Sequence, residues 1–164
     1  MVREDNAKLL LDALKRTGVN FVASLPDFSL VRVVERLFED KDFIHVPLSR
    51  EEEGVGVCAG AYLTGKRCAL LMQNAGMLNA CNSLSTTALQ FQIPMLLLVL
   101  YAGYRGDVAF PTLGQVTEPV LDALRIPHHI LGRVEDAYEV FGGALGQAYN
   151  MKKPVAVLMA KWIF

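Results

Sequence analysis

The sequence lacks any apolar run long enough to span a membrane. Its longest run, Ile93 to Ala102, has the length of a strand and contains Pro94, whereas a membrane-spanning helix needs about 20 apolar residues. The amino terminus has no apolar signal-peptide core, the formal net charge is −1, and lysine and arginine form no block that would neutralise phosphates. We therefore expect a cytoplasmic protein that binds neither membranes nor nucleic acid.

Cysteine is scarce, and several catalytic motifs are missing. The three cysteines, Cys58, Cys68 and Cys81, show no CxxC spacing and sit in apolar contexts, so we expect reduced core residues, with metal ligation as the alternative. No HExxH or GxSxG pattern supports a hydrolase. Neither a GxGxxG turn nor a P-loop follows a strand, so a diphosphate group would have to be held elsewhere, for example by another chain.

The patterns that are present alternate between helix and strand. The composition, 52% hydrophobic and 20% charged over residues 1–164, fits one compact domain. Short apolar runs predict strands at 21–25 (ended by Pro26), 43–47, 68–72, 95–100, 129–131 and 155–159. Helical spacing predicts helices at about 4–17, 30–37, 49–63, 77–89, 118–124 and 134–149. Because the central strands are continuously apolar, we expect an α/β fold with a parallel sheet covered by helices on both faces.

One turn gathers several amides and a glycine. The stretch from Gln73 to Asn82 directly follows the strand at 68–72 and opens a helical segment. In an open parallel sheet, ligands bind outside the carboxyl ends of the strands, and asparagine amides both donate and accept hydrogen bonds. The stretch contains no carboxylate, histidine or cation. It therefore predicts a site for a neutral or anionic group.

Three consecutive acids, Glu51, Glu52 and Glu53, open a helix of small apolar residues that we expect to be buried. In one interpretation Ser49 and Glu52 form a capping box, with acids favoured by the helix dipole. In the other, one carboxyl projects into an apolar site, where desolvation favours its neutral form and suits it to exchange a proton with a ligand nitrogen. Helical spacing does not choose between Glu51 and Glu52, whereas Glu53 shares its stripe with glycines and is the weakest candidate.

Two further charged residues follow predicted strands. Asp27 is either the N-cap of the next helix or an acid presented at the carboxyl edge of the sheet, and both roles can hold at once. Arg105 lies among glycines after the strand at 95–100, where a guanidinium can present a planar fork to an anion. Its alternative is a surface arginine paired with Asp107.

Four blocks of the sequence together resemble the pyrimidine-binding domain of thiamine-diphosphate-dependent decarboxylases. The chain looks most like the alpha subunits of sulfopyruvate decarboxylases and the matching half of phosphonopyruvate decarboxylases. The resemblance implies the three-layer thiamine-diphosphate-binding fold, with a mostly parallel six-stranded sheet and helices on both faces. The blocks are Arg50-Glu51-Glu52-Glu53-Gly54, Gln73-Asn74-Ala75-Gly76-Met77-Leu78-Asn79-Ala80, Ile93-Pro94-Met95 and Gly103-Tyr104-Arg105-Gly106-Asp107.

The resemblance also implies roles for individual residues. Glu52 matches the acid that, in relatives, hydrogen-bonds N1′ of the cofactor's aminopyrimidine and promotes removal of the thiazolium C2 proton. Asp27 matches a position that faces the reacting carbon, which implies proton delivery after carbon dioxide has left. The remaining implied roles are contacts to the pyrimidine or the substrate by Asn74, Gly76 and Asn79, and to the anionic substrate tail by Arg105.

The same resemblance implies a missing half of the site. Relatives hold diphosphate and Mg²⁺ with a separate domain that carries a Gly-Asp-Gly…Asn-Asn type of motif, and residues 1–164 contain no such motif. We therefore expect a beta subunit that supplies this domain and holds Mg²⁺, in a hetero-oligomer with at least two copies of each chain. The implied reaction is decarboxylation of sulfopyruvate, as in coenzyme M biosynthesis. Phosphonopyruvate as substrate, carboligation, and a catalytically silent regulatory homologue remain alternatives, and departures from the family such as Ala75 leave the substrate open.

Overall fold

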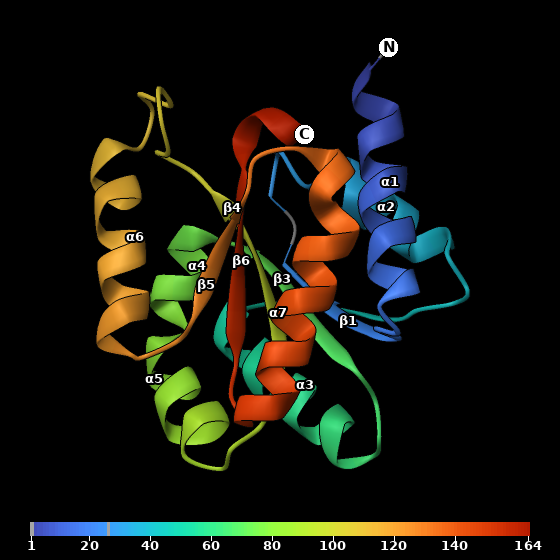
Figure 1. The fold of residues 1–164 in the computed structure, drawn as a ribbon, viewed down its shortest axis with the longest axis vertical. Helices are drawn as coiled ribbons and strands as arrows, with labels where there is room; N and C mark the ends of the chain where they lie inside the picture. The colour runs from blue at the N-terminus through green and yellow to red at the C-terminus, as the bar shows by residue number, and fades with distance from the viewer. Residues whose placement is uncertain (1, 26) are drawn as a thin grey trace.

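The fold is built on one sheet of six parallel strands (Figure 1). The computed structural model describes the backbone of residues 2–25 and 27–164, and the side chains of these residues from 6 onward. Pro26, which we expected to end the first strand, lies outside the described residues. The strand order is β2-β1-β3-β4-β6-β5, and every pairing is parallel, where we expected a mostly parallel sheet. The strands are β1 (Phe21–Ser24), β2 (Ile44–Pro47), β3 (Cys68–Gln73), β4 (Leu96–Tyr101), β5 (His128–Leu131) and β6 (Val155–Ala160).

Helices cover both faces of this sheet (Figure 1). One face is covered by α1 (Val2–Arg16), α2 (Val31–Glu39) and α7 (Ala137–Met151). The other is covered by α3 (Glu51–Leu63), α4 (Asn74–Asn79), α5 (Cys81–Ser83), the π-helical turn η1 (Leu84–Leu89) and α6 (Pro111–Ala123). Short 3-10 turns η2 (Val134–Asp136) and η3 (Lys161–Ile163) precede α7 and follow β6.

The central strands are continuously apolar because both of their faces are buried. In β4, Leu96, Leu98 and Leu100 pack toward α1 and α7, whereas the alternating Leu97 and Val99 pack toward the opposite helices. Successive side chains of a strand point to opposite faces, so a strand covered on both sides needs apolar residues at every position. This confirms the three-layer α/β fold that the sequence predicted.

Three helices differ from the expected ones. The helix expected at 118–124 begins at Pro111, because proline suits the first helical position and lacks only an N–H that would be unpaired there. The helix expected at 77–89 begins at Asn74, so the amide-rich turn is itself the first turn of α4. The α3 helix is buried on one face only, since Gly56, Gly60 and Leu63 are exposed.

The chain changes direction across the sheet between β1 and β3. From β1 it crosses through α2 to the edge strand β2, whereas from β3 it proceeds through α4, α5 and η1 to β4 on the other side. In open parallel sheets, the connections that leave two such neighbouring strands diverge and open a crevice at the carboxyl edge. The fold therefore places its natural ligand crevice where β1 and β3 end.

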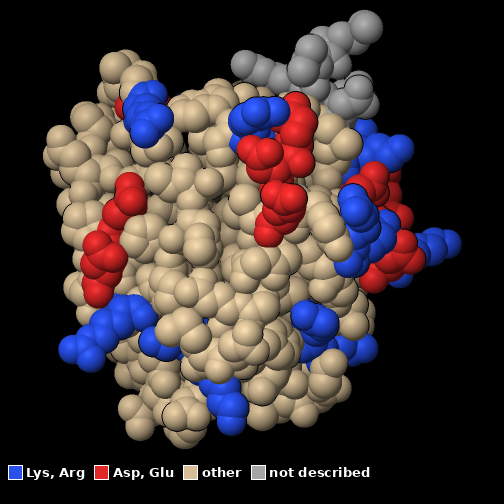
Figure 2. All heavy atoms as spheres, viewed as in Figure 1, with Lys and Arg blue, Asp and Glu red and all other residues tan. Residues whose placement is uncertain are grey.

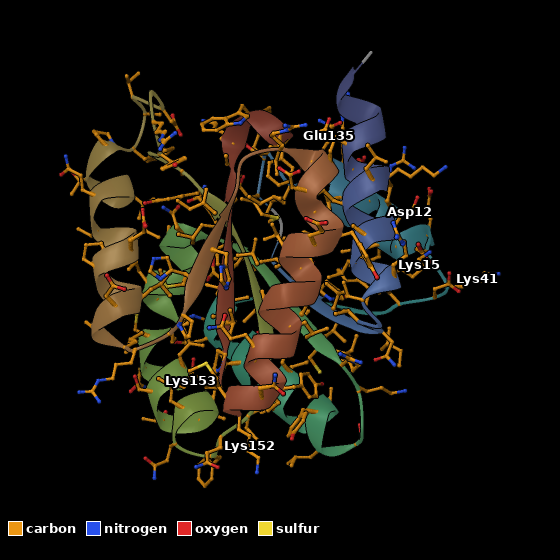
Figure 3. All side chains as sticks on the ribbon, in the orientation of Figure 1. Asp12, Lys15, Lys41, Glu135, Lys152 and Lys153 are labelled. Atoms are coloured by element: carbon orange, nitrogen blue, oxygen red, sulfur yellow. The ribbon has the colours of Figure 1, made fainter. Side chains whose placement is uncertain are left out.

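Charged side chains lie in scattered groups on the surface. Figure 2 shows acidic and basic residues interspersed on one face of the molecule, separated by wide uncharged areas. One such group joins α1 to the turn after α2, where Lys15 Nζ lies 2.7 Å from Asp40 and 2.9 Å from Asp42 (Figure 3 labels Lys15). Within the described part of the chain, no helix has both the length and the apolar character that crossing a membrane requires.

Candidate active site

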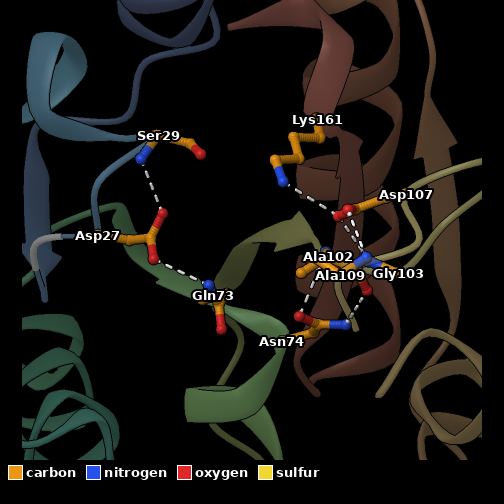
Figure 4. Close-up of polar contacts among 9 residues, drawn as sticks. All are labelled: Asp27, Ser29, Gln73, Asn74, Ala102, Gly103, Asp107, Ala109 and Lys161. Atoms are coloured by element: carbon orange, nitrogen blue, oxygen red, sulfur yellow. Dashed lines mark hydrogen bonds and ion pairs between the residues drawn. The ribbon is translucent and has the colours of Figure 1, made fainter. Parts of the chain in front are cut away.

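Asp27 is held at the β1–β3 crevice by two hydrogen bonds. Its Oδ1 accepts the backbone N–H of Ser29 at 2.9 Å, and its Oδ2 accepts the side-chain amide of Gln73 at 2.8 Å (Figure 4). Asp27 therefore forms an Asx turn, and the N-cap position of α2 falls to Leu30. The expected helix-cap role is thus replaced by a local turn, while the expected position at the carboxyl edge of the sheet is confirmed.

A cleft of about 680 Å³ opens beside Asp27. Three charged residues, Asp27, Arg32 and Lys161, line it together with an apolar wall that includes Leu100, Phe110 and Phe164. This volume is in the range of about 300–1,000 Å³ that is usual for small-molecule sites, which combine apolar walls with a few placed polar groups. A hollow of about 750 Å³ over α2 is lined by residues of that helix alone, so the crevice is the better candidate.

The three acids of α3 have three different environments. Glu53 caps the helix, because its Oε2 accepts the backbone N–H of Ser49 at 3.2 Å and of Arg50 at 3.3 Å. The capping box therefore starts at Arg50 and uses Glu53, which corrects the expected pair of Ser49 and Glu52. Glu52 is 44% exposed and lies 3.4 Å from Arg50 Nε, an exposed ion pair of the kind that contributes only about 0–1 kcal/mol.

Glu51 packs against the amide-rich turn. A side chain at Gly76 would collide with the Cγ, Cδ and Oε1 atoms of Glu51, so the glycine is what lets α3 and α4 approach so closely. Gly76 is thereby given a packing role that its position in the turn did not reveal. The structure brings Glu51 to the turn at residues 73–82 and leaves Glu52 at the surface of α3.

Asn74 and Asn79, two amides of this turn, differ in their surroundings. Asn74 is fully buried, and its Nδ2 donates to Ala102 O at 2.9 Å and to Thr117 Oγ1 at 2.8 Å, while its Oδ1 accepts the Ala102 N–H at 3.3 Å. These contacts tie the ends of β3 and β4 to α6, which gives Asn74 a structural role. A ligand role for its side chain has no support from this geometry. Asn79 is exposed at the end of α4 and remains a candidate.

The loop between β4 and α6 places Arg105 outside the cleft lining. Arg105 is exposed, and its guanidinium carbon lies 5.2 Å from the centre of the Tyr104 ring. Asp107 is instead bound by the Gly103 N–H at 3.0 Å, the Ala109 N–H at 3.3 Å and Lys161 Nζ at 3.3 Å (Figure 4). The expected alternative, an ion pair between Arg105 and Asp107, is therefore wrong, because Lys161 reaches Asp107 from the end of β6.

Sequence reasoning missed two residues of the site, Gln73 and Lys161. Gln73 was grouped with the turn without a role of its own, although it orients Asp27. Lys161 lies two residues after the strand expected at 155–159 and directly after β6, and this position at a strand end was the signal that could have identified it. Both residues contact partners that are distant in sequence: Gln73 lies 46 residues from Asp27, and Lys161 lies 54 residues from Asp107.

The cysteines of the chain are free thiols, and they form no metal site with other side chains among the described residues. Cys58 and Cys68 are free and buried, and Cys81 is free and half-buried. A hydrogen bond with Cys68, and then burial, raise the pKa of the Cys58 thiol, so this thiol stays protonated. Among the residues that the structure describes, no group of three or more histidine, cysteine, aspartate or glutamate side chains is placed to hold a metal ion.

Known proteins resemble this chain over most of its length. Residues 5–126 match the family described as thiamine pyrophosphate enzyme, N-terminal TPP binding domain. Sulfopyruvate decarboxylase subunit alpha of Methanococcus maripaludis is 39% identical over 90% of this chain and 89% of its own length. Phosphonopyruvate decarboxylase of Streptomyces viridochromogenes is 28% identical over 69% of this chain and 29% of its own length. A solved structure of a putative thiamin diphosphate-dependent enzyme from Mycobacterium smegmatis superposes with a TM-score of 0.74 at 20% identity, over 97% of this chain and 31% of that one.

Proposed function

Because the chain belongs to the family of thiamine pyrophosphate enzyme N-terminal domains, we propose that it is the alpha subunit of a thiamine-diphosphate-dependent sulfopyruvate decarboxylase. The observation that carries this proposal is the 39% identity to such a subunit along nearly the full length of both chains. The product would be sulfoacetaldehyde, released with carbon dioxide, as in coenzyme M biosynthesis. Phosphonopyruvate is the second candidate substrate, and the relative named for it is less similar and covers less of the chain.

The described residues fit the pyrimidine half of thiamine diphosphate. Glu52 presents a carboxyl group at the surface of α3, and Gly56, one turn further along, has nothing within 4 Å of where its side chain would begin. A flat ring brought by a neighbouring subunit therefore has room beside the Glu52 carboxyl. Asn79 lies exposed on the neighbouring helix α4 and would contact the same ring.

The cofactor supplies, when bound, a carbon nucleophile and an electron sink for the loss of carbon dioxide from a 2-oxo acid. Glu52 would share a proton with a ring nitrogen of the pyrimidine, and contact with the partner subunit would exclude water from its carboxyl group. Glu51 would act beside it as a positioning residue, through its packing on Gly76.

Asp27 would deliver the proton that completes the aldehyde. It lies at the crevice with both carboxyl oxygens oriented by N–H donors, from Ser29 and from Gln73. A side chain that is held in place to donate a proton to the reacting group typically accelerates the reaction by about 10²–10⁴-fold. The apolar side chains of the cleft, Leu100, Phe110 and Phe164, would exclude water from this step.

A beta subunit would complete the site. Within the described residues no cluster of carboxylates is placed to hold Mg²⁺, and the sequence has no glycine-rich turn for a diphosphate. The partner would bring both, and its contact would cover the exposed Glu52. Each cofactor site would lie between an alpha and a beta subunit, and we expect an assembly with at least two copies of each chain.

The test is reconstitution. The chain, a candidate beta subunit, thiamine diphosphate and Mg²⁺ are mixed, and carbon dioxide release is followed with sulfopyruvate and with phosphonopyruvate. We expect release from sulfopyruvate only when all components are present. Release by this chain without a partner would refute the split site. A complex that assembles and binds cofactor but releases no carbon dioxide from either acid would favour a silent regulatory subunit, and preference for phosphonopyruvate would identify the other substrate.

A further inference from the structure

We propose that Lys161 binds the anionic tail of the 2-oxo acid substrate and sets the preference for substrates that carry a sulfonate or phosphonate at that end. This inference rests on the proposed decarboxylase function. Lys161 belongs to none of the sequence motifs described above. The inference assigns tail binding to Lys161, at the end of β6, in place of Arg105, in the loop after β4.

Lys161 faces Asp27 across the cleft. It is the first residue after β6, and it lines the same cleft as Asp27 and Gln73. In Figure 4 its side chain extends from the end of β6 into the space between Asp27 and Asp107. A molecule bound in the cleft with its reacting carbon near Asp27 would therefore have its far end near the Lys161 ammonium group.

The contact with Asp107 orients Lys161 without using all of its donors. Lys161 Nζ lies 3.3 Å from Asp107 Oδ2, and the lysine side chain is 43% exposed, whereas that of Asp107 is 12% exposed. An ammonium group has three N–H donors, and this contact occupies one of them. The Asp107 carboxylate also accepts the N–H groups of Gly103 and Ala109, so part of its charge is already balanced by the loop backbone.

The chemistry of decarboxylation favours the tail as the partner of this cation. The substrate carries two negative groups, a carboxylate and a tail. The carboxylate loses its charge as carbon dioxide forms, so a cation beside it would stabilise the substrate more than the transition state and would slow the reaction. A cation beside the tail stabilises the substrate and the transition state equally, so it strengthens substrate binding without slowing the reaction. Lys161 lies across the cleft from Asp27, on the side suited to the tail.

The walls of the cleft strengthen this interaction. Leu100, Phe110 and Phe164 line the same cleft as Lys161, and apolar walls lower the local dielectric in which a charged pair interacts. Arg105 lacks such surroundings, because it does not line the cleft. Arg32 lines the cleft from α2 as a second cation, and like Lys161 it is exposed.

The test uses the complex of alpha and beta subunits with three variants. Lys161→Met removes the charge, Lys161→Arg retains it, and Lys152→Met removes an exposed lysine that precedes the same strand at the opposite edge of the sheet (labelled in Figure 3). The kcat/KM values for sulfopyruvate and for pyruvate, which has no charged tail, are compared. We expect Lys161→Met to lower the value for sulfopyruvate about 10–100-fold more than that for pyruvate, as for a lost hydrogen bond to a charged group. Lys161→Arg should recover most of the loss, and Lys152→Met should change neither value.

A binding measurement separates this inference from the proposed function. Calorimetry with sulfoacetate and with acetate reports tail binding without turnover, so it applies even to a complex that decarboxylates neither acid. Weaker binding of sulfoacetate to Lys161→Met, with acetate unchanged, would support the inference. An equal effect of Lys161→Met on sulfopyruvate and pyruvate, or a selective loss in Arg105→Ala instead, would overturn it while leaving the decarboxylase assignment intact.

Discussion

The side-chain amide of Gln73 donates a hydrogen bond to Asp27 Oδ2 across 2.8 Å and thereby joins the ends of β1 and β3. These two strands are neighbours in the sheet, and the connections that follow them diverge to opposite sides. The contact thus spans the crevice at the point where an open parallel sheet binds its ligands. It also fixes the orientation of Asp27, which lines the cleft.

We predict that Asp27→Asn lowers decarboxylase turnover by about 10²–10⁴-fold, because the side chain can no longer deliver a proton to the product. Gln73→Leu should lower turnover by a smaller factor, on the order of 10-fold, since Asp27 keeps its Ser29 contact but loses one of its two orienting donors. Steady-state kinetics with sulfopyruvate measure both effects. Gln115→Leu, at an exposed position of α6, is the matched control. Loss of cofactor C2 proton exchange in Asp27→Asn would argue against a role late in the reaction.

The three acids of α3, Glu51, Glu52 and Glu53, should differ in function. We predict that Glu52→Gln slows deuterium exchange at C2 of the bound cofactor by at least about 10²-fold, because an amide cannot exchange the proton with the pyrimidine nitrogen. Glu53→Gln should leave exchange unchanged and weaken the helix cap, with a cost of up to about 1 kcal/mol in the free energy of unfolding. Proton exchange followed by NMR, and denaturant unfolding, measure the two quantities. If Glu51→Gln rather than Glu52→Gln stops exchange, the acid that packs on Gly76 is the one that contacts the ring.

A close approach of two backbone segments should make one glycine intolerant of substitution. A side chain at Gly114 would collide with the backbone carbonyl of Gly103, which lies at the start of the loop that carries Arg105. We predict that Gly114→Ala lowers the free energy of unfolding by about 1–3 kcal/mol, because backbone must move to relieve the overlap. Gly143→Ala, on the exposed side of α7 with nothing within 4 Å, should raise it by about 0.5–1 kcal/mol through helix propensity. Equal stabilities of the two variants in denaturant unfolding would contradict the close packing of this loop.

The loop after β4 should lose stability in acid. The Gly103 N–H holds the pKa of Asp107 below its usual range, with further help from the Ala109 N–H and Lys161, although burial acts in the opposite direction. Since the folded-state pKa is depressed, the carboxylate stabilises the fold fully above the unfolded value of about 4, and this contribution is lost as the pH falls through the folded value.

We therefore predict that Asp107→Asn destabilises the protein at pH 7 and that its difference from the wild type shrinks as the pH falls below about 4. Denaturant unfolding at a series of pH values measures this difference. Asp12→Asn, at an exposed position of α1 (labelled in Figure 3), is the control and should show little difference at any pH. A difference for Asp107→Asn that does not vary with pH would mean that the carboxylate charge is not what holds the loop.

Much of the architecture was predictable because it depends on local patterns. Continuous apolar runs such as Leu96 to Leu100 require burial on both faces, and their alternation with helical spacing leads to a parallel sheet between two layers of helices. The family was predictable from short blocks of residues that are contiguous in sequence, such as the one around Glu52, and the family match over residues 5–126 confirmed it. The position of Asp27 at a strand end also followed from local order alone.

The sequence by itself therefore determined the layers of the fold and the family, and it predicted the edge of the sheet at which we expect a ligand. Only the tertiary structure decided which residues meet there: Gln73 with Asp27 and Lys161 with Asp107 through polar contacts, and Glu51 with Gly76 through packing. Periodicity within a segment is set by the geometry of one helix or strand, so it can be read locally. Contacts between segments depend on strand order, register and the close approach of backbones, and these arise only when the whole sheet and its covering helices pack together.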